Sequence, residues 1–412
     1  MVNFTGILFG TFGNDWLLGN SANNWIFAWD GHDTIRGGNG SDLIYGGNGN
    51  DYIDGGNGND YVYGGNGVDK IYGGYGNDKL YGGDSWDTVY GEGGNDTLID
   101  RNGYMHGGTG SDTLIADYSN SSYNGIYFGA EGQQIIQTQG SKILSFSAIE
   151  TFEVTGTDDD DQFNVNVITG GESEFFGGEG NDTFYSDKRM GRYLNGALFG
   201  GNDDDTFIAT EGYLDGGRDT DTLIADYTAL SYDGRGIEFG YYSGGGGYEY
   251  GVRVMGHSPY NPLLTFQDIE IFEAIGTQHN DIFHSRGESS LYKGGAGNDT
   301  FIGEKGTFYG QSGDYDHLSS DFSNSYRYQS AMSIDLTEGE IRSGDNNQVL
   351  ISHQGIETFE IIATQHNDTL TGSNGDDILQ GHRGNDLIEG GAGNDILDSG
   401  YSSFNAGNDV LK

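Results

Sequence analysis

Residues 37–99 read GGNGSDLIY, GGNGNDYID, GGNGNDYVY, GGNGVDKIY, GGYGNDKLY, GGDSWDTVY and GEGGNDTLI, seven nine-residue units without insertion or deletion. Each unit follows G-G-x-G-x-D-x-U-x, where U is apolar. Weaker units extend the register backwards through GTFGNDWLL (10–18), GNSANNWIF (19–27) and AWDGHDTIR (28–36). Because side chains alternate along a strand, position 8 is predicted to point inward and positions 7 and 9 outward. This period predicts a parallel β-solenoid in which six residues form a turn, three form a strand and two units complete one coil.

The composition supports a repeat protein built from strands. The chain has 412 residues with 76 glycines and 2 prolines, but no collagen-like period of three, so the glycines are expected to serve turns. No segment shows an apolar stripe of helical period, and no run approaches the roughly 18 apolar residues of a membrane span. The sequence contains no cysteine, which rules out disulfides and thiolate metal sites. We therefore expect an all-β chain without a membrane span.

The charge points to bound cations. Asp and Glu number 63 against 18 Lys and Arg, giving a formal net charge of −45. Aspartate recurs at position 6 of every unit from Asp33 to Asp96, so stacked coils would bring carboxylates into self-repelling columns. Several Ca²⁺ ions, which prefer hard oxygen ligands, would convert this repulsion into attraction and stabilise the folded coil. A halophilic solvated surface is the alternative, but it would not require a fixed period. Nucleic acids and acidic membranes are unsuitable partners for such a charge.

The sequence divides into three parts. Residues 1–106 form an N-terminal β-roll, and residues 363–412 form a C-terminal one that begins with ATQHNDTLT, GSNGDDILQ, GHRGNDLIE and GGAGNDILD. Between them, residues 107–362 contain three longer modules, at about 107–215, 216–309 and 310–362. Each module has an alternating strand pattern, IETFEV, IEIFEA or IETFEI, with single nine-residue units such as GGEGNDTFY and GGAGNDTFI nearby. We expect wider, irregular coils of the same solenoid there.

The strict units at 28–99 and 363–398, about a quarter of the chain, resemble the repeats-in-toxin (RTX) family, also called haemolysin-type calcium-binding repeats. The resemblance implies a right-handed parallel β-roll in which each calcium lies between the turns of units n and n+2. In the family, one turn supplies carbonyls of positions 2 and 4 and the position-6 carboxylate. The other supplies carbonyls of positions 1 and 3 and its own carboxylate.

Carried onto this sequence, the resemblance implies ions between Gly38, Gly40, Asp42 and Gly55, Asn57, Asp60; between Gly47, Gly49, Asp51 and Gly64, Asn66, Asp69; between Gly56, Gly58, Asp60 and Gly73, Tyr75, Asp78; between Gly65, Gly67, Asp69 and Gly82, Asp84, Asp87; and between Gly74, Gly76, Asp78 and Gly91, Gly93, Asp96. Further predicted ligands are Asp33, Asp112, Asp182, Asp205, Asp221, Asp299, Asp368, Gly375, Asp377, Asp386, Gly390, Ala392 and Asp395. Asn24 departs from the pattern at position 6. Ser85 replaces glycine at position 4, which predicts a strained turn.

One outward face of the N-terminal roll is aromatic. Alternate units belong to the same sheet, and one sheet is predicted to present Phe27, Tyr45, Tyr61, Tyr63 and Tyr81, with column neighbours about 4.8 Å apart. Such an exposed strip is typical of an interaction site, and we expect it to contact another subunit or a surface polysaccharide. The alternative is that tyrosine simply favours strands.

The sequence does not predict an enzyme. Neither H-E-x-x-H nor G-x-S-x-G, which family proteases and lipases carry, occurs. His279, His366 and the carboxylates of Asp158 to Asp161 all fall in repeat turns, which favours a structural interpretation.

Two functions remain open. The first is a calcium-dependent structural or adhesive protein of the cell surface or matrix, of surface-layer, fibril or adhesin type. The second is the secretion and stabilisation part of an extracellular polysaccharide-modifying or other hydrolytic enzyme. The resemblance implies export without a cleaved N-terminal signal, and the start MVNFTGILFG lacks the basic head and apolar core of such a signal.

Overall fold

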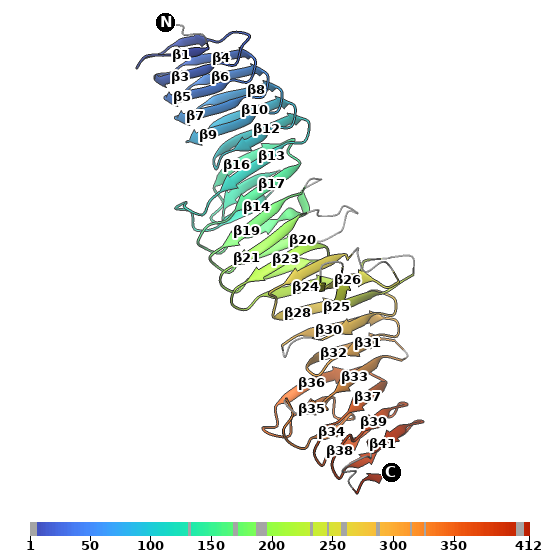
Figure 1. Ribbon diagram of the computed structural model, residues 1–412. Helices are drawn as coiled ribbons and strands as arrows, with labels where there is room; N and C mark the ends of the chain where they lie inside the picture. The colour runs from blue at the N-terminus through green and yellow to red at the C-terminus, as the bar shows by residue number, and fades with distance from the viewer. Residues whose placement is uncertain are drawn as a thin grey trace. The chain divides into compact units, whose positions relative to one another are not determined.

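The computed structural model describes residues 6–130, 133–167, 172–186, 196–230, 234–244, 247–256, 262–285, 289–313, 315–324, 327–400 and 408–412. The chain forms two compact units, one of residues 1–207 with 211–219 and the other of residues 208–210 with 220–412. Each unit consists of strands stacked in two layers (Figure 1). The all-β solenoid is thus confirmed, whereas the finer division into rolls and modules stays a prediction.

In the first unit, one sheet contains β1 (Ile7–Phe9), β3 (Trp25–Asp30), β5 (Leu43–Asn48), β7 (Tyr61–Asn66), β9 (Lys79–Asp84), β11 (Thr97–Ile99), β13 (Thr113–Asp117), β17 (Thr151–Thr155), β19 (Glu174–Gly178), β21 (Ala197–Gly201) and β23 (Gly212–Gly217). The other contains β2 (Trp16–Leu18), β4 (Thr34–Asn39), β6 (Tyr52–Asn57), β8 (Lys70–Tyr75), β10 (Asp87–Gly93), β12 (Gly103–Thr109), β14 (Ile126–Ala130), β15 (Gln134–Gln137), β16 (Lys142–Ser147), β18 (Gln162–Asn164) and β20 (Thr183–Ser186). A short 3-10 helix, η1 (Val165–Val167), follows β18, and β22 (Thr206–Ala209) spans the division between the units.

In the second unit, one sheet contains β25 (Ile237–Gly244), β26 (Gly247–Val254), β27 (Leu264–Gln267), β29 (Ile282–His284), β31 (Thr300–Ile302), β33 (His317–Asp321), β37 (Thr358–Ile362), β39 (Ile378–Gln380) and β41 (Ile396–Asp398). The other contains β24 (Thr222–Asp226), β28 (Ile271–Ile275), β30 (Leu291–Ala296), β32 (Gly306–Ser312), β34 (Ser333–Asp335), β35 (Glu340–Arg342), β36 (Val349–Gln354), β38 (Thr369–Thr371), β40 (Leu387–Glu389) and β42 (Val410–Leu411).

The register confirms that two units make one coil. Strand β5 pairs in parallel with β7, placing Leu43 opposite Tyr61 and Ile44 opposite Val62, so equivalent residues are 18 apart. The strands are longer than predicted, because the parallel ladder continues through the first three residues of the next unit. In the same pair, for example, Gly47 lies opposite Gly65.

Position 8 forms the core, as predicted. In the regular repeats this core is a stack of aliphatic side chains with 0% exposure: Ile26, Ile35, Ile44, Ile53, Val62, Ile71, Leu80, Val89 and Leu98. The wider coils that follow use phenylalanine at the equivalent place. The rings of Phe163 and Phe184 stack at a centroid distance of 4.9 Å, and those of Phe283 and Phe301 at 5.4 Å. Larger side chains fill the greater volume that a wider coil encloses.

The irregular coils contain antiparallel insertions. Strands β14, β15 and β16 form an antiparallel meander, whose first strand also pairs in parallel with β18 and whose last pairs in parallel with β12. In the second unit, β34, β35 and β36 repeat this arrangement against β38 and β32. Strands β25, β26 and β27 form a third meander, in which β25 pairs with β29. Each insertion therefore widens a coil without interrupting the parallel ladder.

Candidate metal sites at the turns

The position-6 aspartates form ladders along the turns. Along each ladder the backbone N–H of one aspartate donates to Oδ1 of the next, one coil later, as from Asp42 to Asp60 at 2.7 Å and from Asp60 to Asp78 at 2.8 Å. The same bond recurs from Asp33 to Asp51, Asp51 to Asp69, Asp69 to Asp87, Asp78 to Asp96 and Asp96 to Asp112. The ladder directly links unit n to unit n+2, the two turns that the sequence predicts to share an ion.

The second carboxylate oxygen has no such role. Oδ2 is buried without a hydrogen-bond partner at Asp33, Asp42, Asp51, Asp60, Asp69, Asp78, Asp87, Asp96, Asp112, Asp182, Asp299 and Asp386. From Asp33 to Asp96 these residues are at most 3% exposed. A buried charged oxygen without a partner is costly. These oxygens therefore fit a hard cation, which would complete their coordination.

The first glycine of each unit leaves room beside these oxygens. A Cβ on Gly37 would lie 2.4 Å from Oδ2 of Asp42 and 2.5 Å from the carbonyl oxygen of Gly55 in the next coil. A Cβ on Gly64 would likewise lie 2.5 Å from Oδ2 of Asp69 and 2.5 Å from the carbonyl oxygen of Gly82. Glycine leaves this space between a carboxylate and a carbonyl open, as a calcium ion needs; the unit that contains Asp33 is an exception, with Ala28 at position 1.

Other predicted ligands lie at the same turns. The carbonyl oxygens of Gly38 and Gly40 face the next coil, since a Cβ on Gly56 or Gly58 would lie 2.1 or 2.0 Å from them. The position-3 carbonyl of Asn57 instead accepts a hydrogen bond from the Gly40 N–H at 2.8 Å, which leaves it one further lone pair. Among the residues that the structure describes, no three His, Asp or Glu side chains gather at metal-binding distance. A cation here therefore needs carbonyl oxygens as well as carboxylates.

The pKa values reflect these surroundings. Burial raises the pKa of Asp60 to about 6 and those of Asp69 and Asp78 to about 7, although the N–H donor of the ladder opposes the shift. Neighbouring position-6 carboxylates raise the pKa of each further. Without a cation, the stacked carboxylates therefore retain protons near neutral pH.

In a second kind of turn, the position-6 aspartate has no orphaned oxygen, meaning no buried carboxylate oxygen without a hydrogen-bond partner. Thr277 donates its N–H to Oδ2 of Asp281 at 2.6 Å, and its hydroxyl lies 3.1 Å from both carboxylate oxygens. The same N–H bond joins Thr11 to Asp15, Thr157 to Asp161, Thr364 to Asp368 and Ser373 to Asp377. These turns share the signature [G/A]-[T/S]-x-x-x-D, a signal that the sequence prediction did not use for Asp368 and Asp377.

The backbone separates the two kinds of turn. Position 2 has positive φ where Oδ2 is orphaned, as at Gly56 (+110°), Gly65 (+115°) and Glu92 (+73°). Thr277 and Thr364 do not have positive φ. The N–H of position 2 therefore reaches the carboxylate in the threonine turns and leaves it free in the glycine turns. Ser85 has φ of +95°, which confirms the predicted strain at that turn.

Glutamates continue the aspartate ladder where a coil widens. Asp112 N–H donates to Glu150 Oε2 at 2.8 Å, and Asp316 N–H to Glu357 Oε2 at 2.9 Å. Each glutamate belongs to the I-E-x-F pattern of its module. The glutamate side chain takes the acceptor role that an aspartate has in the regular coils, a role that the sequence prediction missed.

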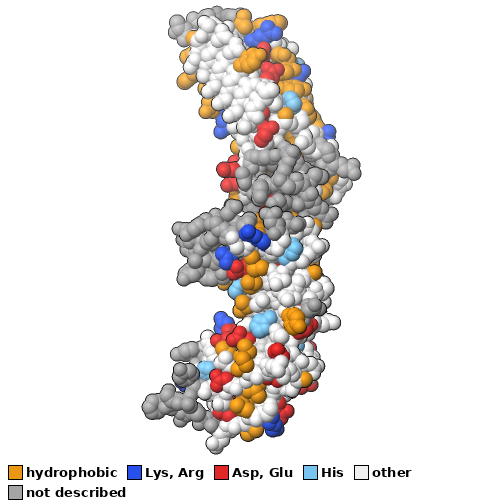
Figure 2. All heavy atoms as spheres, turned by 90° about the vertical axis from the view of Figure 1, so that its right-hand side faces the viewer, with side chains coloured by type: hydrophobic (Ala, Val, Ile, Leu, Met, Phe, Trp, Pro, Cys, Tyr) orange, Lys and Arg blue, Asp and Glu red, His pale blue; other side chains and the backbone are white. Residues whose placement is uncertain are grey.

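The residues at position 5 form an outer ladder of polar hydrogen bonds, which the sequence prediction also missed. The backbone N–H of Asn77 donates to Oδ1 of Asn59 at 2.9 Å, and that of Asn95 to Oδ1 of Asn77 at 2.8 Å. Its hydrogen bonds run opposite to those of the aspartate ladder. Figure 2 shows a broad white area on the N-terminal part, where backbone and uncharged polar side chains cover the surface.

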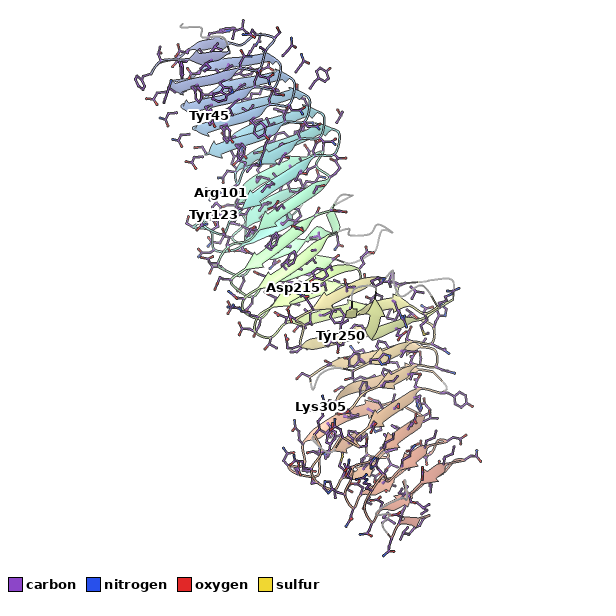
Figure 3. All side chains as sticks on the ribbon, in the orientation of Figure 1. Tyr45, Arg101, Tyr123, Asp215, Tyr250 and Lys305 are labelled. Atoms are coloured by element: carbon purple, nitrogen blue, oxygen red, sulfur yellow. The ribbon has the colours of Figure 1, made fainter. Side chains whose placement is uncertain are left out.

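The aromatic column of the first sheet is present. Rings stack from Phe9 through Phe27, Tyr45 and Tyr63 to Tyr81, with centroid distances of 5.6, 5.2, 4.7 and 4.4 Å and interplanar angles of at most 18°. We call these five residues the aromatic strip; Tyr45 is labelled in Figure 3. The neighbouring Tyr61 is 51% exposed.

The second sheet also presents a row of tyrosines. Tyr72 and Tyr90 stack at 5.0 Å, and Tyr52 lies 5.5 Å from Tyr72. The two faces therefore differ in the length and regularity of their aromatic rows rather than in kind.

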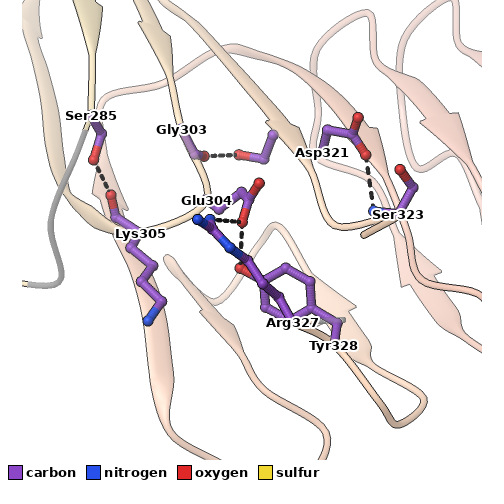
Figure 4. Close-up of polar contacts among 9 residues, drawn as sticks. Ser285, Gly303, Glu304, Lys305, Asp321, Ser323, Arg327 and Tyr328 are labelled. Carbon is purple, nitrogen blue, oxygen red and sulfur yellow. Dashed lines mark hydrogen bonds and ion pairs between the residues drawn. The ribbon is translucent and has the colours of Figure 1, made fainter. Parts of the chain in front are cut away.

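A cavity of about 550 Å³ in the second unit is lined in part by Lys305, Arg327, Tyr328 and Asp345. Glu304 accepts hydrogen bonds from Arg327 and Tyr328 at 3.1 and 2.8 Å, which anchors these two residues (Figure 4).

The histidines of the TQHND turns play a structural part. The backbone N–H of His279 donates to the Thr277 hydroxyl at 3.0 Å, and the equivalent bond joins His366 to Thr364 at 3.1 Å. These bonds involve the histidine backbone and stabilise the turn.

Comparison with known proteins agrees with this geometry. The model of the RTX calcium-binding nonapeptide repeat matches residues 9–44, 30–62, 63–98, 166–188, 291–314 and 362–397. These ranges contain most of the aspartates with an orphaned Oδ2. No curated protein matches the chain. Within the described residues, no helix has the length and apolar content to cross a membrane.

Proposed function

We propose that this chain, an RTX-type parallel β-roll protein with calcium-binding repeats, is a secreted structural protein of the cell surface or extracellular matrix. It folds when it meets external calcium, and it assembles through the aromatic strip. The role is structural rather than catalytic.

The observation that carries the proposal is the set of buried, unpartnered Oδ2 atoms along the turns. The unfolded chain holds these oxygens in water, whereas the folded chain buries them beside the position-1 glycines. A cation that binds only the folded coils stabilises them by linkage, at about 1.4 kcal/mol per site when its free concentration is ten times the dissociation constant. Calcium thereby couples folding to the extracellular medium.

The geometry of the aromatic strip favours protein assembly over sugar binding. Its rings stack along the column, with interplanar angles of 5° from Phe27 to Tyr45 and from Tyr45 to Tyr63. Stacking covers the ring faces and leaves edges and hydroxyl groups outward. A flat sheet from a second copy packs against edges of this kind, whereas stacking on a sugar requires an open ring face. The proposed partner is therefore another copy of this chain, with a surface polysaccharide as the alternative outcome.

The cavity near Lys305 gives little support to hydrolysis of polysaccharides. Glycoside hydrolysis generally uses two carboxylates, and among the described residues that line this cavity Asp345 is the one carboxylate.

The test uses the full chain in chelator and in millimolar calcium. Circular dichroism is expected to show a gain of strand signal from chelator to calcium, and electron microscopy is expected to show filaments or layers in the calcium-containing sample. Replacing Tyr45, Tyr63 and Tyr81 by Ser should abolish assembly without abolishing the calcium-induced strand signal. Replacing Tyr72 and Tyr90 by Ser on the opposite sheet is the matched control. Unchanged assembly of the triple variant would contradict the assembly role. Loss of binding to an insoluble polysaccharide alone would indicate the glycan alternative.

A further inference from the structure

The half-coil after the tenth unit breaks the repeat. Residues 100–106 (DRNGYMH) number seven instead of nine. Strand β10 pairs with β12 so that Asp87 lies opposite Gly103. The next coil on this edge therefore has no position-6 carboxylate opposite Asp87, and the aspartate ladder of this edge ends there.

Asp100, which belongs to a different turn, supplies a carboxylate near Asp87 on this edge. In the preceding coil of this edge, a Cβ on Gly64 would meet its own unit's Asp69 and the carbonyl oxygen of Gly82. A Cβ on Gly82 would instead lie 1.8 Å from Oδ2 of Asp100 and 3.0 Å from Oδ2 of Asp87. The Asp100 side chain thus occupies the position that a carbonyl oxygen takes one coil earlier.

Both of these oxygens are buried and without a hydrogen-bond partner. Asp87 is 0% exposed and Asp100 is 5% exposed. Their other oxygens are used by the fold. Oδ1 of Asp87 accepts from the Asp69 N–H at 2.7 Å, and Oδ1 of Asp100 accepts from the N–H groups of Arg101 and Asn102 at 2.6 and 3.1 Å. In the described part of the chain, no ion pair joins either carboxylate to a basic side chain.

The loop that carries Asp100 is held in place by two tyrosines. The Tyr118 hydroxyl donates to the carbonyl oxygen of Arg101 at 2.7 Å, and the Tyr123 hydroxyl donates to Oδ1 of Asn102 at 2.9 Å. Figure 3 shows Arg101 and Tyr123 on the same side of the N-terminal unit. A small cavity lined in part by Tyr81, Ile99, Arg101 and Asp117 also borders Asp100.

We propose that Asp87 and Asp100 hold a further Ca²⁺ that closes the ion column on this edge of the roll. Oδ2 of Asp100 enters the space beside Gly82 and Oδ2 of Asp87 borders it, so that a divalent cation bound to both oxygens neutralises both carboxylates. The site lies outside the nine-residue rule, because Asp100 belongs to no G-G-x-G-x-D turn. It rests on the calcium dependence proposed above, with a ligand that the repeat does not supply.

The experiment counts the calcium ions bound per full-length chain by equilibrium dialysis. Asp100→Asn keeps an acceptor for the Arg101 and Asn102 N–H groups but removes the charge. It is expected to bind one ion fewer than the wild type. Asp226→Asn, an exposed aspartate outside this cavity whose Oδ1 accepts from the Thr228 N–H at 2.9 Å, is the matched control and is expected to bind the wild-type number.

Equal counts for Asp100→Asn and Asp226→Asn would overturn the site and would indicate that the two carboxylates share a proton instead. A wild type that binds no calcium would instead contradict the proposed function. If Asp100→Asn does not fold, the test is anomalous scattering from wild-type crystals grown with calcium chloride, which locates the bound calcium ions. A calcium peak between Asp87 and Asp100 supports the site, and peaks at the repeat turns without one there overturn it.

Discussion

The backbone N–H of Asp60 donates a 2.8 Å hydrogen bond to Oδ1 of Asp78, while Oδ2 of Asp78 is buried without a hydrogen-bond partner. One carboxylate thus performs two tasks. Its first oxygen aligns neighbouring coils of the folded chain, and its second oxygen gains a partner only when a cation binds. The fold therefore depends on calcium. The register of neighbouring coils does not depend on calcium, because hydrogen bonds within the chain set it.

Replacing Asp78 by Asn tests this division. Asparagine retains an oxygen for the Asp60 N–H but loses the charge that binds the cation. We expect the free energy of unfolding to fall by about 1.4 kcal/mol or more at calcium ten times above the dissociation constant, with a smaller difference in chelator. Denaturant unfolding at several calcium concentrations measures this. Asp54→Asn, which removes a carboxylate from an outward face, is the control. An equal loss at all calcium concentrations would contradict the prediction.

Acidification should partly replace calcium. The pKa values of Asp69 and Asp78 are about 7 in the calcium-free fold because burial disfavours the ionised form, against 3.8 for an ordinary aspartate. The folded state therefore binds protons more tightly than the unfolded state. This contribution to stability is complete below about pH 4 and is lost as the pH rises through about 7. Calcium-depleted protein should resist denaturant better at pH 5 than at pH 8.

The same protons should oppose calcium. Binding requires ionised carboxylates, so the apparent calcium affinity is expected to fall as the pH decreases below about 7. Calorimetric titrations at pH 6 and pH 8 measure the change. A calcium affinity that does not depend on pH would show that the position-6 carboxylates are not ligands.

Replacing Gly64 by Ala should block a site. The new Cβ would lie 2.5 Å from both Oδ2 of Asp69 and the carbonyl oxygen of Gly82, so the coils must separate. We expect a loss of about 1–3 kcal/mol in stability and weaker calcium binding. The control is Gly93→Ala, since a Cβ there would meet its nearest neighbour, the Thr109 hydroxyl, at 3.4 Å. Equal stability of the two variants in calcium would contradict the prediction.

Replacing Thr277 by Val tests the turns that close without an orphaned oxygen. Valine keeps the β-branched shape but removes the hydroxyl that contacts both oxygens of Asp281. A hydrogen bond to a charged group contributes about 1.5–3 kcal/mol, so we expect a loss of that size with or without calcium. The control is Thr300→Val, on the outward side of β31. A loss seen only in chelator would show that calcium takes over at this turn.

Much of the fold follows from local pattern. The 18-residue coil, the inward aliphatic stack from Ile26 to Leu98, the stacked Tyr45 and Tyr63, and the positive φ of Ser85 all agree with the prediction. Each depends on residues within one unit or on a strict period, which are visible in the sequence. The extension of the strands through position 3 was missed, because it depends on hydrogen bonds to the next coil.

The nine-residue pattern was enough to predict the repeat: which residue of each unit points inward, which carboxylate reaches the turn, and that stacked carboxylates need cations. The stacking of the coils in three dimensions was needed to show which carboxylates have an orphaned oxygen. Asp281 and Asp299 occupy the same position in their units, yet Thr277 satisfies the first, while Oδ2 of the second has no hydrogen-bond partner. Likewise, Asp100 meets Asp87 at Gly82 because a shortened half-coil moves it there. The physical reason is that a site between coils combines groups from separate turns. Whether these groups come close together depends on the backbone φ and on the length of each coil, and no single nine-residue unit specifies either.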